Sequence, residues 1–451
     1  MTVQELTKAS QERAAVRSPF ALVALASAAL LAVLDGTVVA VALQPLSRAF
    51  GAPLTTMVWV TVGYLLAAAS MLPLLGWATA RFGRRRVFLT GLVLFILGSA
   101  LSAAAWSAPA LIGFRMIQGF GGGLLEPMSL ALAAAISPKE SIGRVLGLMS
   151  TIINVAPVLG PIVGTLLLQA GSWRWLFIVN LPAGLIVLVL ALTLVRVDEP
   201  DRETPAPRAD VRGLALLTSG YVLVLFALNR SGWIALAVAL IGVVLLAFYV
   251  RHALTARVTP ALDLRLLRRP GYGASIAIMG LVGLIMYGQL TSLPLVAAAR
   301  GATGLQRGLF VTALGIGLLV SMSNGGRISD RTGPKRLVGI GGAVTAVLLG
   351  LFVLVGPSLG TVALFALFIA VGLGFGATAS PTVASVYRTL PLADQAQGTT
   401  SMFMTVQLAA SLGVTLLGLL PTDRFFTLLA VAAIGIVALS RRLPGETDQQ
   451  R

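Results

Sequence analysis

The sequence predicts an all-α polytopic membrane protein with 14 transmembrane helices: two six-helix bundles with two additional helices between them. Of its 451 residues, 57% are hydrophobic and only 11% are charged. The mean hydropathy is +0.93, which is typical of a membrane protein. The apolar runs are long enough to cross a hydrocarbon core of about 30 Å. A basic segment between two such runs occurs twice, which indicates an internal repeat.

Apolar runs divide the chain into three parts. Six runs fall in a predicted N-terminal bundle (residues 1–195), two in a middle part with linkers (196–270) and six in a predicted C-terminal bundle (271–451). The linker before the middle pair is charged and proline-containing, which is typical of a loop. The break at residues 137–140 is the weakest. The predicted limits are 20–43, 56–75, 87–106, 109–136, 141–168, 175–195, 211–228, 233–250, 271–299, 308–326, 337–356, 360–386, 397–420 and 425–440.

Residues 76–86 and 326–336 are the two copies of the basic segment, 250 residues apart. Six helices of about 20 residues with short loops need roughly 190 residues, so the rest of the separation accounts for the two additional helices. Both copies are predicted to be cytoplasmic gating loops. The first has Ala80 where the second has Asp330, so the first loop lacks a carboxylate that could cap a helix or pair with an arginine. The loop residues are Gly76, Arg81, Gly83, Arg84, Arg85, Gly326, Asp330, Arg331 and Gly333.

The positions of the basic residues predict the orientation of the chain in the cell (inner) membrane. The net charge is +17, and 26 of the 33 Lys and Arg residues fall in the loops and termini that would be cytoplasmic if the N-terminus is inside. Six fall in the outer loops, and one, Arg115, lies within a run. This bias follows the positive-inside rule, so both termini are predicted to be cytoplasmic. It also explains the net charge without nucleic acid as a partner.

Several kinds of chemistry are disfavoured. The chain has no cysteine and one histidine, His252, so disulfides and thiolate metal sites are excluded and no metal or other cofactor is predicted. His252 stands beside Arg251 at a predicted helix end, where we expect a solvated side chain. The glycine-rich residues 119–123 lie inside an apolar run and not after a strand, so they do not form a phosphate-binding loop. No nucleophile or acidic constellation for an enzyme is evident.

Three formal charges lie inside the apolar runs: Asp35, Arg115 and Glu126. Such charges are costly in a bilayer and usually face a cavity, pair with each other and serve function. Asp35 and Arg115 have similar predicted depths, so an ion pair is possible, although separate roles remain open. Glu126 shares a helix face with Arg115 to within about 20°, with Gly119 and Gly122 between them, which suggests a groove. Glu126 could equally be an interfacial carboxylate without a coupling role.

Polar residues within apolar runs are candidates for a substrate cavity, although each could instead join helices by buried hydrogen bonds. In the fifth run, two glycines four residues apart permit close helix contact, and a proline between them bends the helix. This segment is predicted to be a hinge or a packing face. The cavity candidates are Tyr64, Gln118, Asn154, Tyr287, Gln289 and Gln407, and the hinge residues are Gly160, Pro161 and Gly164.

These motifs occur together in one family. In order with the basic segments come residues 34–43, residues 115–119, Gly160–Pro161 with Gly164, residues 173–177 with Asn180 and Pro182, and residues 262–265. The set resembles the signatures of the major facilitator superfamily, in particular its fourteen-helix drug:proton antiporter branch. The sequence departs from that pattern at Ala80, where an acid is usual, at Ala40, where Asn is usual, and at Gln44, where Pro is usual.

The resemblance implies the major facilitator fold and a proton-coupled exporter of amphiphilic, cationic drugs or toxic compounds. Asp35, Arg115 and Glu126 would be the proton-coupling residues, with Asp35 loaded by protons from outside and Arg115 tuning it. The expected partners are protons, a small amphiphilic molecule and the lipid bilayer, and the expected state is a monomer. A proton-coupled metabolite exporter or importer is the alternative within the superfamily. A non-transporting membrane scaffold or an enzyme is the alternative outside it.

Overall fold

The computed structural model describes residues 19–138, 141–195, 209–256, 258–303 and 305–444. The described part is all-helical, with 87% of its residues in helices. Fourteen helices in the described part are long and apolar enough to cross a membrane, by length and composition. The predicted fold class and number of spans are therefore confirmed, including the weak break after the fourth span, where the helix ends at Ile136.

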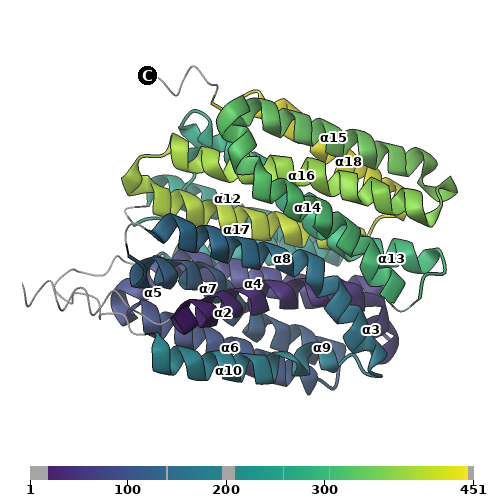
Figure 1. The fold of residues 1–451 in the computed structure, drawn as a ribbon, viewed down its shortest axis with the longest axis horizontal. Coiled ribbons are helices and arrows are strands. Elements are labelled where there is room, and N and C mark those ends of the chain that lie inside the picture. Colours follow the sequence, from purple (N-terminus) through teal and green to yellow (C-terminus); the bar gives the residue numbers. More distant parts are fainter. Residues whose placement is uncertain (1–18, 139–140, 196–208, 257, 304, 445–451) are drawn as a thin grey trace, which may run out of the picture.

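Six spans make up the N-terminal part of the structure, drawn in purple to teal in Figure 1. The first and second are longer than predicted, because each continues through a short 3-10 segment into a further helix. The elements are α2 (Pro19–Val38), η1 (Val39–Ala42), α3 (Leu43–Phe50), α4 (Leu54–Met71), η2 (Leu72–Leu74), α5 (Leu75–Phe82), α6 (Arg84–Ala103), α7 (Ala108–Ile136), α8 (Ile142–Gln169), α9 (Trp175–Ile178) and α10 (Asn180–Leu194).

Two middle spans and six C-terminal spans follow. The C-terminal group is green to yellow in Figure 1 and lies above the N-terminal group, with the helices roughly parallel in the two. The domain boundaries drawn from the sequence stay a prediction. The elements are α11 (Val211–Leu228), α12 (Trp233–Thr255), η4 (Leu266–Arg268), α13 (Tyr272–Ala299), α14 (Leu305–Thr332), α15 (Pro334–Val355), η5 (Gly356–Ser358), α16 (Thr361–Thr389), α17 (Leu392–Leu417) and α18 (Thr422–Ser440).

The two basic segments are mostly helical, which corrects their assignment as loops. Gly76 and Arg81 lie in α5, and the corresponding residues of the second copy lie in α14. The chain reverses only at Gly83 and Gly333, whose φ angles are 87° and 74°. At both turns the glycine amide donates to the carbonyl four residues earlier, at 2.9 Å. Glycine is needed because other L-residues rarely adopt this φ, so the repeat preserves one tight turn between two helices.

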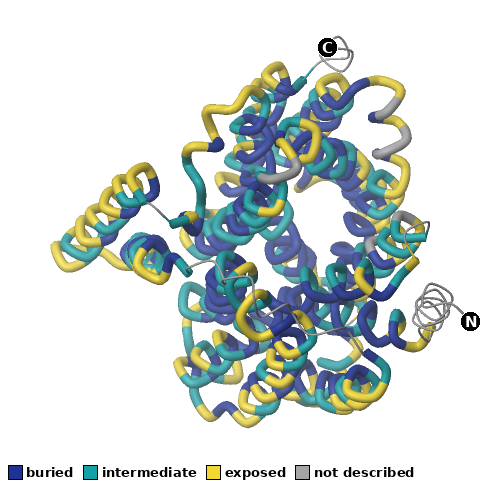
Figure 2. The backbone as a smooth tube through the Cα atoms, turned by 90° about the vertical axis from the view of Figure 1, so that its left-hand side faces the viewer, coloured by how far each residue is buried: buried dark blue, intermediate teal, exposed yellow. Residues whose placement is uncertain are grey.

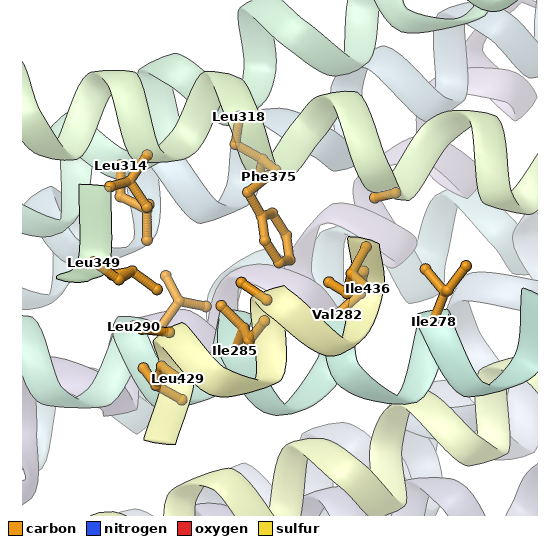
Figure 3. Close-up of a cluster of buried hydrophobic side chains, with 14 of the residues drawn as sticks. Ile278, Val282, Ile285, Leu290, Leu314, Leu318, Leu349, Phe375, Leu429 and Ile436 are labelled. Carbon is orange, nitrogen blue, oxygen red and sulfur yellow. The ribbon is translucent and has the colours of Figure 1, made fainter. Parts of the chain in front are cut away.

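Each group of six spans has its own apolar packing. In the N-terminal group the cluster runs from Ala21 to Val195. The C-terminal cluster joins α13, α14, α16 and α18, and in Figure 3 Phe375 of α16 points toward Ile285 of α13. Where α14 crosses α16, a Cβ on Gly317 or Gly372 would collide with the backbone of the other helix. Figure 2 shows the resulting pattern, with buried residues inside and exposed ones around the rim.

The orientation predicted from charge can be tested because the chain has no native cysteine. A membrane-impermeant maleimide should label Ser231→Cys, in the loop between α11 and α12, in intact cells. It should not label Thr255→Cys at the other end of α12, because that end is predicted to be cytoplasmic. Tags fused at Met1 and Arg451 should likewise be inaccessible from outside. External labelling of either terminus would contradict the orientation.

Candidate functional site

A buried ion pair joins α2 to α7. The Nη1 atom of Arg115 donates to Oδ2 of Asp35 at 2.5 Å, and both side chains are 0% exposed. The pairing that similar depth made possible is therefore confirmed. Two charges in such a place stabilise each other, and removal of one would leave the other uncompensated, at a cost of about 3–5 kcal/mol.

Three neutral polar residues complete the site. Gln118 accepts from Nη1 of Arg115 at 2.7 Å and donates to Oδ1 of Asp35 at 2.9 Å. Asn180, at the start of α10, donates to the same Oδ1 at 2.7 Å. Both amides also donate to Oγ of Ser99 on α6, at 3.2 and 3.0 Å. The Asp35 carboxylate thus accepts three hydrogen bonds from donors on two other helices, an arrangement that suits its ionised form.

Neither Ser99 nor Asn180 was expected in the site from the sequence, and Gln118 was expected in the substrate cavity. Gln118 is 0% exposed and does not line the central cavity, so its assignment to that cavity is wrong for this structure. Asn180 belongs to a motif of the family pattern, and its amide within an apolar run was the signal that could have found it. Ser99 gave no such signal, because a lone serine in a membrane helix usually bonds to its own backbone.

The Arg115 guanidinium has further contacts besides Asp35. Its Nε donates to the carbonyl of Val60 at 3.3 Å, and its Cζ lies 4.3 Å from the ring centroid of Tyr64 and 5.7 Å from that of Phe177. The electron-rich face of an aromatic ring attracts a cation. Its Nη2 has no hydrogen-bond partner among the described residues. Arg115 therefore retains one free donor beside the ring of Tyr64.

A cavity of about 70 Å³ lies between the two groups of helices. Of the predicted cavity residues, Tyr64, Tyr287 and Gln407 line it, and so does Glu126, which was predicted as a proton-coupling residue. Among the described residues, Glu126 is the one charged residue in the lining, and the others are apolar or neutral. The lining residues are Ala32, Val33, Gly36, Tyr64, Ala68, Leu72, Gly122, Gly123, Glu126, Pro127, Leu130, Tyr287, Phe403 and Gln407.

Two other cavity candidates lie elsewhere. Gln289 is 1% exposed and lines a separate small cavity of about 10 Å³ together with Pro157 and Phe375. Neither its Oε1 nor its Nε2 has a hydrogen-bond partner among the described residues. Asn154 is half-buried on α8 and is not part of the lining of the central cavity. The assignment of Gln289 and Asn154 to the central cavity is therefore wrong for this structure.

Tyr64 separates the ion pair from the cavity. Its hydroxyl donates to the carbonyl of Ala32 at 3.1 Å, and its ring lies under Arg115 on one side and lines the cavity on the other. The groove expected at Gly119 and Gly122 is filled by this residue, because a Cβ on either glycine would collide with Tyr64. The glycines of α7 thus make room for a neighbouring helix instead of a ligand.

The predicted hinge on α8 is a packing face on both sides. A Cβ at Gly160 would collide with Thr37 of α2, and one at Gly164 would lie 2.8 Å from the carbonyl of Val38. On the other side, a Cβ at Gly308 of α14 would lie 2.5 Å from the carbonyl of Pro161. Close approach between the two groups of helices therefore occurs through α8, next to the helix that carries Asp35. Whether α8 also bends during function stays a prediction.

This architecture defines a class of protein. Two groups of six membrane helices enclose a central cavity, and one group contains a buried ion pair beside it, which is the arrangement of a two-bundle secondary transporter. No cluster of three or more metal-ligating side chains occurs in the described part of the chain.

The chain belongs to the Major Facilitator Superfamily, whose family profile matches residues 25–414. It is 33% identical over 423 residues to a protein from Mycobacterium tuberculosis named multidrug resistance protein B homolog, covering 92% of this chain and 78% of that protein. It is 30% identical over 414 residues to the tetracenomycin C resistance and export protein of Streptomyces glaucescens, covering 89% and 76%. It is 32% identical over 447 residues to the probable actinorhodin transporter of Streptomyces coelicolor, covering 92% and 74%.

Solved structures show the same fold. The crystal structure of a D-xylose–proton symporter superposes with a TM-score of 0.68 at 17% identity, covering 94% of this chain and 97% of that one. A POT family transporter in complex with 5-aminolevulinic acid superposes with a TM-score of 0.70 at 18% identity, covering 93% and 94%. This chain is therefore a multi-pass membrane transporter that acts on small molecules, with relatives named for multidrug resistance and antibiotic export.

Proposed function

We propose that the protein is a proton-coupled exporter that exchanges protons for amphiphilic cations. The observation that carries the proposal is the position of the Asp35–Arg115 ion pair beside the cavity. Only the ring of Tyr64 lies between them. Among the described residues that line the cavity, Glu126 carries the single charge. A carboxylate that changes its partner when a proton binds can couple two transport steps if the partner sits on a moving helix.

The contacts of Asp35 suggest how the coupling would work. In the structure all its hydrogen-bond partners are donors, and a proton on the carboxylate would remove the negative charge that holds Arg115. Arg115 would then lose its counter-ion and move toward another partner, and Tyr64, stacked on it, would move with it. Arg115 and Glu126 lie on the same helix, α7. A shift of α7 would therefore change both the proton site and the cavity wall.

The lining of the cavity supports amphiphilic cations as substrates. Glu126 offers a negative charge in a place with little water, where an opposite charge is attracted more strongly than at the surface. Tyr64, Tyr287 and Phe403 add aromatic faces, which bind both apolar groups and cations. Relatives named for multidrug resistance and for tetracenomycin C resistance and export support drug-like small molecules as the substrate class.

The contacts between the two groups of helices favour a cavity that faces the cytoplasm. The α8–α14 contact at Gly308 and Pro161 and a hydrogen bond from Thr312 to the carbonyl of Val158 (3.3 Å) lie in the halves of these helices predicted to be outside. The cavity wall includes Glu126 and Leu130, which lie toward the opposite end of α7. We infer that this state would load substrate from inside the cell. We also propose that the protein lies in the inner membrane and acts as a monomer.

Proteoliposomes provide the test of the proposal. Vesicles preloaded with ethidium, with a pH-sensitive dye in the lumen, should release ethidium faster when the outside is made acidic, and the lumen should acidify at the same time. Collapse of the pH gradient with nigericin should slow the release to the rate of protein-free vesicles. Release that is independent of the gradient would contradict proton coupling.

Glu126→Gln should weaken export of cations selectively. Removing the one charge in the lining takes away an electrostatic attraction for ethidium, and we expect about a tenfold loss, equivalent to about 1.4 kcal/mol. Export of the neutral amphiphile chloramphenicol should change much less. Glu126→Asp keeps the charge and serves as the control. An equal loss for both substrates would indicate that Glu126 has a structural or protonation role instead.

A further inference from the structure

A groove outside the transport path lies where the two additional helices meet at one end. It has a volume of about 540 Å³ and is formed by the first turns of α11 and the last turns of α12. On α12 the contributing residues are spaced by three and four positions, so they share one helix face. The lining consists of Arg212, Leu216, Phe248, Arg251, His252 and Thr255.

Asp210 holds this end of the helix pair together. Its Oδ1 accepts a hydrogen bond from the amide of Gly213 at 2.9 Å, so Asp210 caps the start of α11. The same oxygen lies 2.7 Å from Nε2 of His252 on α12. Its Oδ2 accepts from the amide of Ala261 at 3.3 Å. The expectation that His252 is a solvated loop residue is therefore wrong. The Asp210 carboxylate is 4% exposed, and its hydrogen bonds are made within the protein. These contacts fix the ends of both helices, so the groove is preformed.

Two arginines in the groove carry positive charge that pairs with no carboxylate of the described residues. Arg212 and Arg251 are both exposed, and within the described residues neither has a carboxylate within ion-pairing distance. They come from different helices and line one concave surface. Because Asp210 is directed inward, an anion in the groove would meet two guanidinium groups that can each donate several hydrogen bonds.

The surroundings of the groove are apolar. Only 11% of the apolar window of α12 is buried inside the structure, and Phe248, Val244 and Ile241 along it are 53%, 50% and 55% exposed. A span with so little protein around it faces lipid. The charged end of the pair is predicted to be at the cytoplasmic surface, where anionic lipids attract basic residues.

We propose that this groove binds an anionic phospholipid of the cytoplasmic leaflet. The phosphodiester would lie between Arg212 and Arg251, and an acyl chain would follow the exposed face of α12 past Phe248. A zwitterionic lipid has the same phosphate but carries a cation that two arginines would repel. A free phosphate would satisfy the arginines without using the apolar wall. The combination of the two surfaces therefore selects an anionic headgroup on a lipid tail.

Lipid binding can be measured directly on the purified full-length protein. In detergent micelles, native mass spectrometry should detect phosphatidylglycerol bound at least tenfold more tightly than phosphatidylcholine. Arg212→Gln with Arg251→Gln should reduce the affinity for phosphatidylglycerol about tenfold. The matched control is Arg441→Gln with Arg442→Gln, because these two arginines are exposed after the end of α18 and do not line the groove. That pair should leave the affinity unchanged.

Two further variants distinguish loss of the lipid site from loss of folding. Arg212→Lys with Arg251→Lys retains the charge and should retain most of the binding, which separates loss of the site from loss of folding. If the glutamine pair does not yield folded protein, Arg251→Gln alone is measured and should give a smaller loss. Equal loss in the control pair, equal binding of both lipids, or displacement of the lipid by millimolar inorganic phosphate would each overturn the proposal.

Discussion

Gly98→Ala should abolish efflux and lower the thermal stability of the purified protein. The Cβ of an alanine at position 98 of α6 would lie 2.5 Å from Cα of Gln118 on α7 and would also meet its backbone nitrogen. Backbone cannot give way as a flexible side chain does, so the two helices must separate, at a cost of about 1–3 kcal/mol. Gln118 joins Arg115 to Asp35, so this displacement also disturbs the ion pair.

The matched control for this substitution is Gly113→Ala on α7. Gly113 is exposed, and no atom lies within 4 Å of the position that its Cβ would take. Alanine there should therefore be neutral or stabilising, since it favours a helix over glycine by about 1 kcal/mol. Melting curves by intrinsic fluorescence and ethidium efflux from proteoliposomes measure both effects. Equal melting temperatures and equal efflux for the two variants would show that α6 and α7 do not depend on this contact.

Much of the fold could be predicted because membranes restrict the options. Each span must satisfy its own backbone hydrogen bonds, so length and hydropathy suffice to count helices. The ends could not be placed, because helices continue beyond the hydrocarbon. The span that starts at Leu54 runs to Phe82 over 29 residues, which is about 43 Å at 1.5 Å per residue. This is why Gly76 and Arg81 are helical although they lie beyond the predicted end of the apolar run.

The site was predictable where it contains charge and unpredictable where it contains neutral polar groups. Asp35 and Arg115 had few alternatives, because an unpaired charge in hydrocarbon is costly. Gln118 and Gln289 could have faced the cavity or a neighbouring helix, and the sequence does not say which side of a span faces which neighbour. Gly119 illustrates the same point: small residues mark a close contact, but only the structure shows that Tyr64 makes it.

Asp35→Asn should abolish gradient-driven efflux while leaving substrate exchange intact. The asparagine cannot carry the titrating proton, yet it retains the size of the carboxyl group. It also leaves Arg115 without its counter-ion in a buried place, and we expect lower stability by up to about 3–5 kcal/mol. Gln118 and the Tyr64 ring remain as partners of the guanidinium and should offset part of this loss.

Two companion variants separate coupling from folding. Asp35→Asn combined with Arg115→Gln removes both charges, so it should recover stability without recovering coupling, because breaking a buried pair costs more than removing it. Asp35→Glu keeps a titratable group and should retain part of the efflux. Ethidium release under an acid-outside gradient measures coupling, and ethidium–ethidium exchange without a gradient measures the transport path alone. If folded Asp35→Asn still responded to the gradient nearly as the unsubstituted protein does, the coupling proton would have to bind elsewhere, and Glu126 would be the residue to test next.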